Sequence, residues 1–214
     1  MKKHIALSFV AFALAACSDD KPSNALFEET INQFAEQEGV CLPLVLNIQN
    51  PLGRDSFRQI PLGSAEIQII EANSSGNTIN QSALKQLDFL ADEGFYKKSE
   101  TDIQLNPKSR ETTTALVYRI TEKGQKQTRT PKDAIPHFCV GHQKVEKINW
   151  YTEPSASNDM TVSRVSYEAR FVAEKWLAEL MKVGGGKLPL DEIHAQTATL
   201  IKTNEGWKDA RELR

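Results

Sequence analysis

Apolar residues in the first half of the chain recur at helical spacing in two places. Over 25–38 they lie on one face of a predicted helix: Phe27, Ile31, Phe34 and Ala35. Ser23 or Asn24 can cap this helix, and Gly39 can end it. A second helix is predicted over 81–93, where the apolar face repeats and Gly94 follows: Leu84, Leu87, Leu90 and Ala91. Each helix therefore needs an apolar surface to cover.

Elsewhere apolar and polar residues alternate, which predicts strands buried on one side. The clearest alternation is Val165 to Phe171, with charged or polar residues between the apolar ones. Further extended segments are predicted at 41–48, 65–70, 115–120, 145–151 and 195–203. A short helix around Trp176 precedes the glycines at 184–186. Because antiparallel strands need a cover, we expect this helix to cover the C-terminal strands.

These patterns predict an α+β fold. The composition is that of a globular protein, with 40% hydrophobic and 25% charged residues among 214. Such a length suits one large domain or two small ones, and the composition excludes collagen-like, disulfide-knot and fully disordered chains. We expect an N-terminal α+β part over 24–136 and an antiparallel β part with a covering helix over 137–214.

The run ALKQLDFLADEGFYKKSE … ALVYRITEKGQ, within 81–125, resembles the end of a winged-helix domain. The resemblance implies a helix followed by a two-stranded wing, with a Thr-Glu-Lys-Gly segment opening the next turn. Winged-helix regulators insert a basic helix into the DNA major groove. Here Lys85 stands against three carboxylates, and the basic residues lie on the wing and after it: Lys97, Lys98, Lys108, Arg110, Lys123, Lys126, Arg129 and Lys132. We therefore expect a fold fragment without the DNA function, and no nucleic acid as a partner.

The first seventeen residues predict export. Lys2 and Lys3 precede an apolar run, Ile5 to Ala16, that is too short for a permanent membrane span and fits a secretory signal over 1–16. It ends in Leu14-Ala15-Ala16-Cys17, which resembles the lipobox of bacterial lipoproteins. The resemblance implies cleavage before Cys17, diacylation of its thiol and usually a third acyl chain. A plain secretory signal with an incidental Cys is the alternative.

Lipidation of Cys17 would make the membrane a partner of the chain, with residues 17–23 as a polar tether. Each buried methylene contributes about 0.8 kcal/mol, and stable anchoring takes roughly two acyl chains. The residue after the Cys is Ser18, not the Asp that usually retains enteric lipoproteins at the inner membrane. The resemblance therefore implies the outer membrane and a periplasm-facing body, although the acidic pair Asp19 and Asp20 leaves the inner membrane open.

The two remaining cysteines, Cys41 and Cys139, form an even pair in a chain predicted to be exported, which predicts a disulfide. Two buried free thiols are the alternative. Removal of the signal also removes Lys2 and Lys3, so that 24 basic residues face 28 acidic ones and the mature net charge is −4. That charge is unfavourable for binding a polyanion.

The segment His137-Phe138-Cys139-Val140-Gly141-His142 carries metal-ligand residue types, but it lacks a second Cys/His pair at metal spacing. A Cys139 nucleophile would need a free thiolate, which an oxidising compartment disfavours. The glycines at 184–186 are not followed by the Gly-Lys-Ser/Thr of a phosphate loop, and His194 beside Glu192 is typical of a surface. We therefore predict no catalytic residue, metal or cofactor.

Four aromatic residues gather in the C-terminal half: Trp150, Tyr151, Trp176 and Trp207. Core positions are favoured for Trp150 and Trp176, whereas Trp207 is open between the core and a partner-binding anchor. The leading hypothesis is a lipid-anchored envelope protein that binds a protein or envelope component without catalysis. The alternatives are an envelope enzyme, a protein that sequesters a small molecule, and an immunity-type lipoprotein that blocks a toxin.

Overall fold

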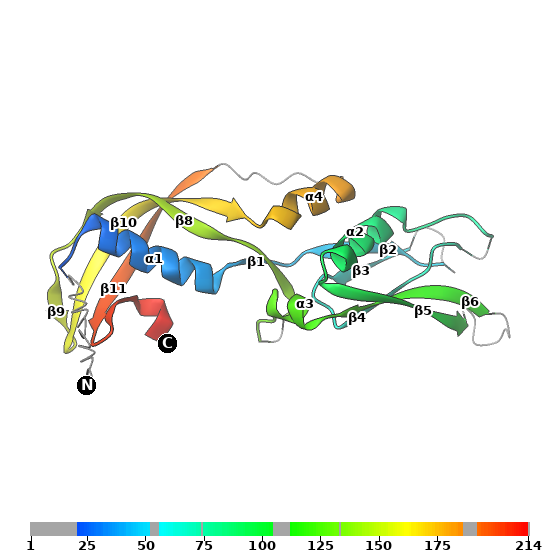
Figure 1. Cartoon of the computed structure of the whole chain (residues 1–214), viewed down its shortest axis with the longest axis horizontal. Coiled ribbons are helices and arrows are strands. Elements are labelled where there is room, and N and C mark those ends of the chain that lie inside the picture. Colours follow the sequence, from blue (N-terminus) through cyan, green and yellow to red (C-terminus); the bar gives the residue numbers. More distant parts are fainter. Residues whose placement is uncertain are drawn as a thin grey trace, which may run out of the picture.

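The computed structural model describes residues 21–51, 56–73, 75–104, 112–132, 134–185 and 192–213. The predicted signal and Cys17 lie outside these ranges. The described chain forms two lobes at the two ends of an elongated molecule (Figure 1). Its helices and strands confirm a mixed α+β fold, with antiparallel sheets throughout.

Lobe 1 is an antiparallel sheet with one helix on its inner face. Its elements are α1 (Asn24–Glu38), β8 (His137–Tyr151), β9 (Ser155–Ser157), β10 (Met160–Ala173), β11 (Ile193–Thr203), β12 (Gly206–Asp209) and the 3-10 helix η1 (Ala210–Leu213). The strand order is β8-β10-β11-β12, with β9 paired to β10. The core between α1 and the sheet contains Phe27, Ile31, Val145, Ile148, Val165, Tyr167, Ala169, Ala198, Leu200 and Trp207.

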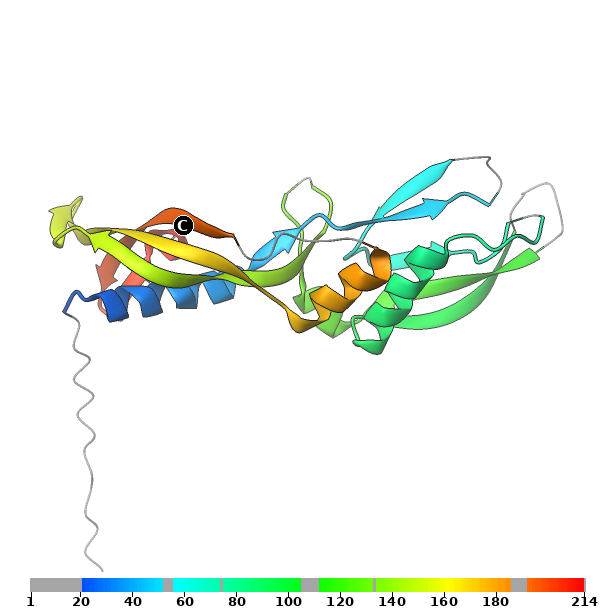
Figure 2. The same cartoon turned by 90° about the horizontal axis from the view of Figure 1, so that it is seen from above.

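Lobe 2 combines a three-stranded sheet, a hairpin, two packed helices and the short helix α3. Its elements are β2 (Val45–Gln49), β3 (Phe57–Pro61), β4 (Glu66–Ile69), α2 (Gln81–Asp92), β5 (Tyr96–Gln104), β6 (Thr112–Ile120), α3 (Glu122–Lys126) and α4 (Lys175–Gly184). The sheet order is β4-β6-β5, and β2 pairs with β3. Helices α2 and α4 lie side by side in both views (Figure 2). Phe95, Phe138 and Trp176 form edge-to-face pairs in the core of this lobe.

One strand joins the two lobes. β8 has 15 residues, so it is about 50 Å long at 3.3 Å per residue. Its first part places Phe138 and Val140 in the lobe 2 core, and its second part places Val145 and Ile148 in the lobe 1 core. β1 (Val40–Leu42) and β7 (Thr128–Arg129) pair with the first residues of β8 and complete the junction.

The two cores do not follow the division expected between residues 136 and 137. Helix α1, from the N-terminal part, packs on the C-terminal sheet, while α4, from the C-terminal part, packs on α2 in lobe 2. The expectation that the Trp176 helix covers the C-terminal strands is therefore wrong: α1 covers them. The apolar face of α4 buries Trp176, Leu177 and Leu180 against lobe 2 instead.

The local elements agree more closely with the sequence pattern. The Ser23 hydroxyl accepts a hydrogen bond from the Leu26 N–H at 3.2 Å and caps α1, and Gly39 ends that helix at a φ of 68°. Helix α2 and strands β5 and β6 form the predicted helix–hairpin succession. The short strands β3, β7, β9 and β12 were not predicted, because each lacks enough alternation to stand out. Within the described residues, no helix is sufficiently long and apolar to span a membrane.

The face of the lobe 1 sheet opposite α1 is called here the outer sheet face. It consists of three cross-strand rows over β8, β10 and β11: Trp150–Ser166–Thr197, Lys147–Glu168–Ala195 and Lys144–Arg170–Ile193. Trp150 is 51% exposed and Ile193 is 56% exposed on this face. The core prediction for Trp150 is therefore wrong, whereas Trp176 is buried as predicted.

Candidate functional site

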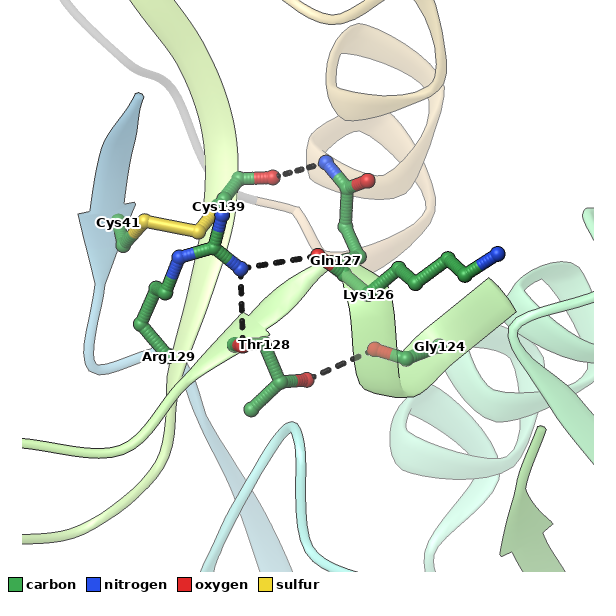
Figure 3. The surroundings of a disulfide bond; sticks show 7 residues. All are labelled: Cys41, Gly124, Lys126, Gln127, Thr128, Arg129 and Cys139. Carbon is green, nitrogen blue, oxygen red and sulfur yellow. Dashed lines mark hydrogen bonds between the residues drawn. A yellow bond between two sulfur atoms is a disulfide. The ribbon is translucent and has the colours of Figure 1, made fainter. Parts of the chain in front are cut away.

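The junction of the lobes contains the predicted disulfide. Cys41 on β1 lies directly opposite Cys139 on β8, and their sulfur atoms are 1.99 Å apart (Figure 3). The bond joins residues 98 positions apart in the sequence. Gln127 holds the Cys139 backbone on both sides, since its carbonyl accepts from the Cys139 N–H at 2.8 Å and its side-chain amide donates to the Cys139 carbonyl.

The residues around the disulfide are tied to the end of α3. Thr128 donates its hydroxyl to the Gly124 carbonyl at 2.9 Å, and Arg129 donates to the carbonyls of Lys126 and Thr128 (Figure 3). Because Cys139 is bonded to Cys41, its thiol is not a nucleophile or a metal ligand. Among the described residues, no three His, Cys, Asp or Glu side chains form a group that could hold a metal.

The structure places Trp207 in the lobe 1 core. It is 6% exposed, and its ring centroid lies 5.1 Å from that of Phe27 in an edge-to-face pair. Of the two positions left open for this residue, the structure shows the core one, because the β11–β12 hairpin folds its ring back onto α1. A buried ring of this kind does not offer a surface anchor, whereas Trp150 does.

A pocket of about 160 Å³ lies between the C-terminal half of α1 and the inner face of the lobe 1 sheet. Its lining residues come from five elements (α1, β8, β10, β11 and η1) and from the residue that ends α1, Gly39: Ile31, Phe34, Ala35, Glu38, Gly39, Gln143, Val145, Tyr167, Ala169, Gln196 and Arg211. The lining combines apolar side chains with polar ones, among them Gln143, Gln196 and Arg211. Ligand pockets are mostly apolar with a few polar groups and measure about 300–1,000 Å³, so a pocket of this size suits only a very small molecule.

One lining residue of this pocket, Arg211, forms an ion pair. The Arg211 guanidinium donates to both carboxylate oxygens of Asp209, at 2.8 Å and 2.7 Å, and lies 4.2 Å from the centroid of the Phe34 ring. The hydrogen bond to Asp209 raises the pKa of Arg211. Because Asp209 is 1% exposed and fully engaged with this cation, the pair contributes no net charge to the pocket.

Two uncharged groups give the pocket its hydrogen-bonding character. Tyr167 donates its hydroxyl to the Gln196 side-chain carbonyl at 3.0 Å, and burial raises the pKa of this tyrosine. The side-chain oxygen of Gln143 is buried and accepts no hydrogen bond within the described residues. A buried acceptor without a donor costs about 1–3 kcal/mol, so a ligand N–H or O–H fits this position. Glu38 adds a carboxylate at the rim.

The sequence did not reveal this pocket, because its residues come from five elements that meet only through the fold. The one available signal was Arg211 two positions after Asp209, a spacing that a tight 3-10 turn converts into an ion pair. The pocket supplies acceptors and an apolar wall, and it therefore suits a small molecule that carries hydrogen-bond donors.

The chain was compared with protein-family models, with curated proteins and with solved structures, and none of them matches it.

Proposed function

We propose that this chain is an exported bacterial lipoprotein, anchored through acyl chains on Cys17, that works by binding a protein or another envelope component. The observation that carries the proposal is the Cys41–Cys139 disulfide. Disulfides persist in oxidising compartments and are rare in the cytosol. Export is what the apolar signal and Leu14-Ala15-Ala16-Cys17 predict independently, and the outer membrane with a periplasm-facing body is the location we propose.

Exposed apolar side chains support a binding role. Phe57 on β3 is 64% exposed and Ile135, just before β8, is 46% exposed. Large apolar side chains that face solvent are the usual anchors of protein interfaces. We propose lobe 2, which carries Phe57, together with the adjoining segment that carries Ile135, as the part that meets a protein partner. An incoming toxin is one such partner, as in immunity lipoproteins.

We keep the winged-helix resemblance of 81–125 as a proposal about fold ancestry alone. It is supported by the order α2, β5, β6 and by the sheet order β4-β6-β5. Helix α2, which would enter DNA in a winged-helix regulator, makes contacts within lobe 2 instead. Its Asp88 binds Lys98 at 2.7 Å and accepts from the Tyr118 hydroxyl at 2.6 Å, and its apolar face packs on α4. A nucleic acid is therefore not among the partners we propose.

The pocket under α1 favours a second candidate function, which is sequestration of a small molecule. The buried Gln143 oxygen and the apolar wall support it. Such a ligand would be neutral or cationic, because Arg211 is already neutralised by Asp209.

Photo-crosslinking in intact cells tests the binding proposal. A photoreactive phenylalanine analogue at Phe57 should yield a discrete crosslinked partner. The matched control places the same group at Ile60, which is 6% exposed on the same strand, and should yield none. Turnover of a cell-wall, lipid or ester substrate by the purified protein, abolished by one substitution, would instead favour the enzyme alternative.

A further inference from the structure

Pro22, just before α1, lies at an edge of the lobe 1 sheet. The Tyr151 hydroxyl, at the end of β8, donates to the Pro22 carbonyl at 3.4 Å. Among the described strands, only β10 pairs with β8 from Gln143 to Tyr151, so this stretch forms a sheet edge. Five residue steps separate Cys17 from Pro22, which can span at most about 17 Å. Acyl chains on Cys17 would therefore lie close to this edge and within reach of either sheet face.

The two faces of lobe 1 differ in charge. The outer sheet face carries four basic residues and two acidic ones. The basic residues are Lys144, Lys147, Arg164 and Arg170, and the acidic ones are Glu146 and Glu168. On the opposite side, α1 carries Glu28, Glu29, Glu36 and Glu38, and it contains no lysine or arginine. The lobe is thus basic on its open sheet face and acidic on its helix face.

The outer sheet face also carries apolar side chains in positions that suit a lipid interface. Trp150 is 51% exposed one residue from Tyr151, at the tether, and Ile193 is 56% exposed on the same face. Tryptophan favours the headgroup region of a bilayer, and basic side chains are attracted to anionic lipids.

We propose that the outer sheet face of lobe 1 lies on an anionic lipid surface, with Trp150 in the headgroup region and the acidic face of α1 turned away. The proposal rests on the lipid anchor of the proposed function and adds the orientation of the folded body. Charge and exposed apolar residues point to the same face, which the tether is long enough to reach, and the repulsion between α1 and anionic lipid disfavours the inverted arrangement.

Tryptophan fluorescence tests this orientation in the acylated full chain. The protein is extracted from cell membranes, its acyl chains are verified by mass, and it is reconstituted into vesicles of brominated phosphatidylcholine with increasing phosphatidylglycerol. Trp176 and Trp207 are 8% and 6% exposed, so lipid-dependent quenching reports Trp150. We expect quenching that rises with the phosphatidylglycerol content and is lost in Trp150→Phe.

Charge variants separate the face from the anchor. Lys144→Glu with Lys147→Glu should lower the quenching at least roughly twofold, because two attractions to anionic lipid become repulsions. The matched control, Lys97→Glu with Lys126→Glu, changes two exposed lysines of lobe 2 and should leave the quenching of Trp150 unchanged.

Several results would overturn the orientation. Acylated protein that sediments with vesicles but shows no lipid-dependent quenching of Trp150 would refute it while leaving the anchor intact. Protection of Trp150 from aqueous acrylamide without lipid, growing with protein concentration, would show that a second copy or another protein covers the face. A chain without acyl groups on Cys17 would remove the proposed function itself, and the mass measurement identifies that case first.

Discussion

The three tryptophans show what a single residue reveals about its place in this protein. Trp176 belongs to a clear helical stripe, and its burial was predictable. Trp150 and Trp207 lie on strands next to bulges or turns. At such places a shift of one residue in the register moves a side chain from one face of the sheet to the other. The register shift between Ser166 and Tyr167 leaves Trp150 outward beside an inward Tyr151. The cysteine pair was predictable because, with Cys17 assigned to the lipid, only one pairing remained.

Tyr96 gives a pH prediction at the residue scale. Its buried hydroxyl accepts from the Gly63 N–H at 2.9 Å, and burial raises its pKa from 10.0 to about 12. Between these values the unfolded chain loses this proton and the folded chain keeps it, so the free energy of unfolding falls as the pH rises. Tyr96 should contribute roughly 2–3 kcal/mol of this fall between pH 10 and 12. Urea unfolding across this range should show a shallower decline for Tyr96→Phe than for the wild type, and equal slopes would contradict the assignment.

Arg211 gives a prediction for the pocket. Arg211→Met should lower the free energy of unfolding by about 2–3 kcal/mol, because Asp209 would lose the cation that its buried carboxylate faces. Arg164→Met, at an exposed position of the sheet, should cost less than about 0.5 kcal/mol. Urea denaturation at neutral pH compares the two variants, and an equal loss in both would show that the ion pair adds nothing to the fold.

At the scale of elements, the longer helices and strands followed from periodicity, and their partners did not. The apolar face of α1 predicts only that this helix covers an apolar surface. Both lobes offer such a surface, so the pattern does not say which lobe α1 joins. In the structure α1 packs on the lobe 1 sheet, where Phe27 and Ile31 share a core with Val145, Tyr167 and Trp207. β8 is longer than the predicted 145–151 because its first part is buried in lobe 2 and does not alternate.

The placement of α4 can be tested by one core deletion. Leu177 is 0% exposed, so Leu177→Ala should cost about 3 kcal/mol. Hydrogen exchange should then accelerate in α2 and in the β4-β6-β5 sheet before it does so in β10 and β11. Lys182→Ala, an exposed change in the same helix, serves as the control. Faster exchange confined to the lobe 1 sheet would contradict the packing of α4 in lobe 2.

At the scale of the whole molecule, the chain passes between the lobes several times. The disulfide links two of these passages, because it joins Cys41 on β1 to Cys139 on β8. The sequence pattern could not predict these crossings, because the apolar face of a helix or strand does not indicate in which lobe it is buried. The pocket was missed for the same reason, since it forms where the end of α1 meets strands from the other half of the sequence.

Removal of the disulfide tests this arrangement. A Cys41→Ser/Cys139→Ser variant should lose about 3–5 kcal/mol of stability, since a bond that closes a loop of 98 residues restricts the unfolded chain. Non-reducing peptide mapping of the native protein should recover the two cysteines in one linked fragment. Two alkylatable thiols in the native, unreduced protein would show that the bond does not form.

The most direct test of the account is the mass of the N-terminal fragment of the protein purified from bacterial membranes. We predict a fragment that begins at Cys17 and carries two or three acyl chains, and its loss from the membrane fraction in Cys17→Ala. A fragment that still begins at Met1, or a Cys17 without acyl chains, would contradict the central claim that lipid holds this folded body in the cell envelope.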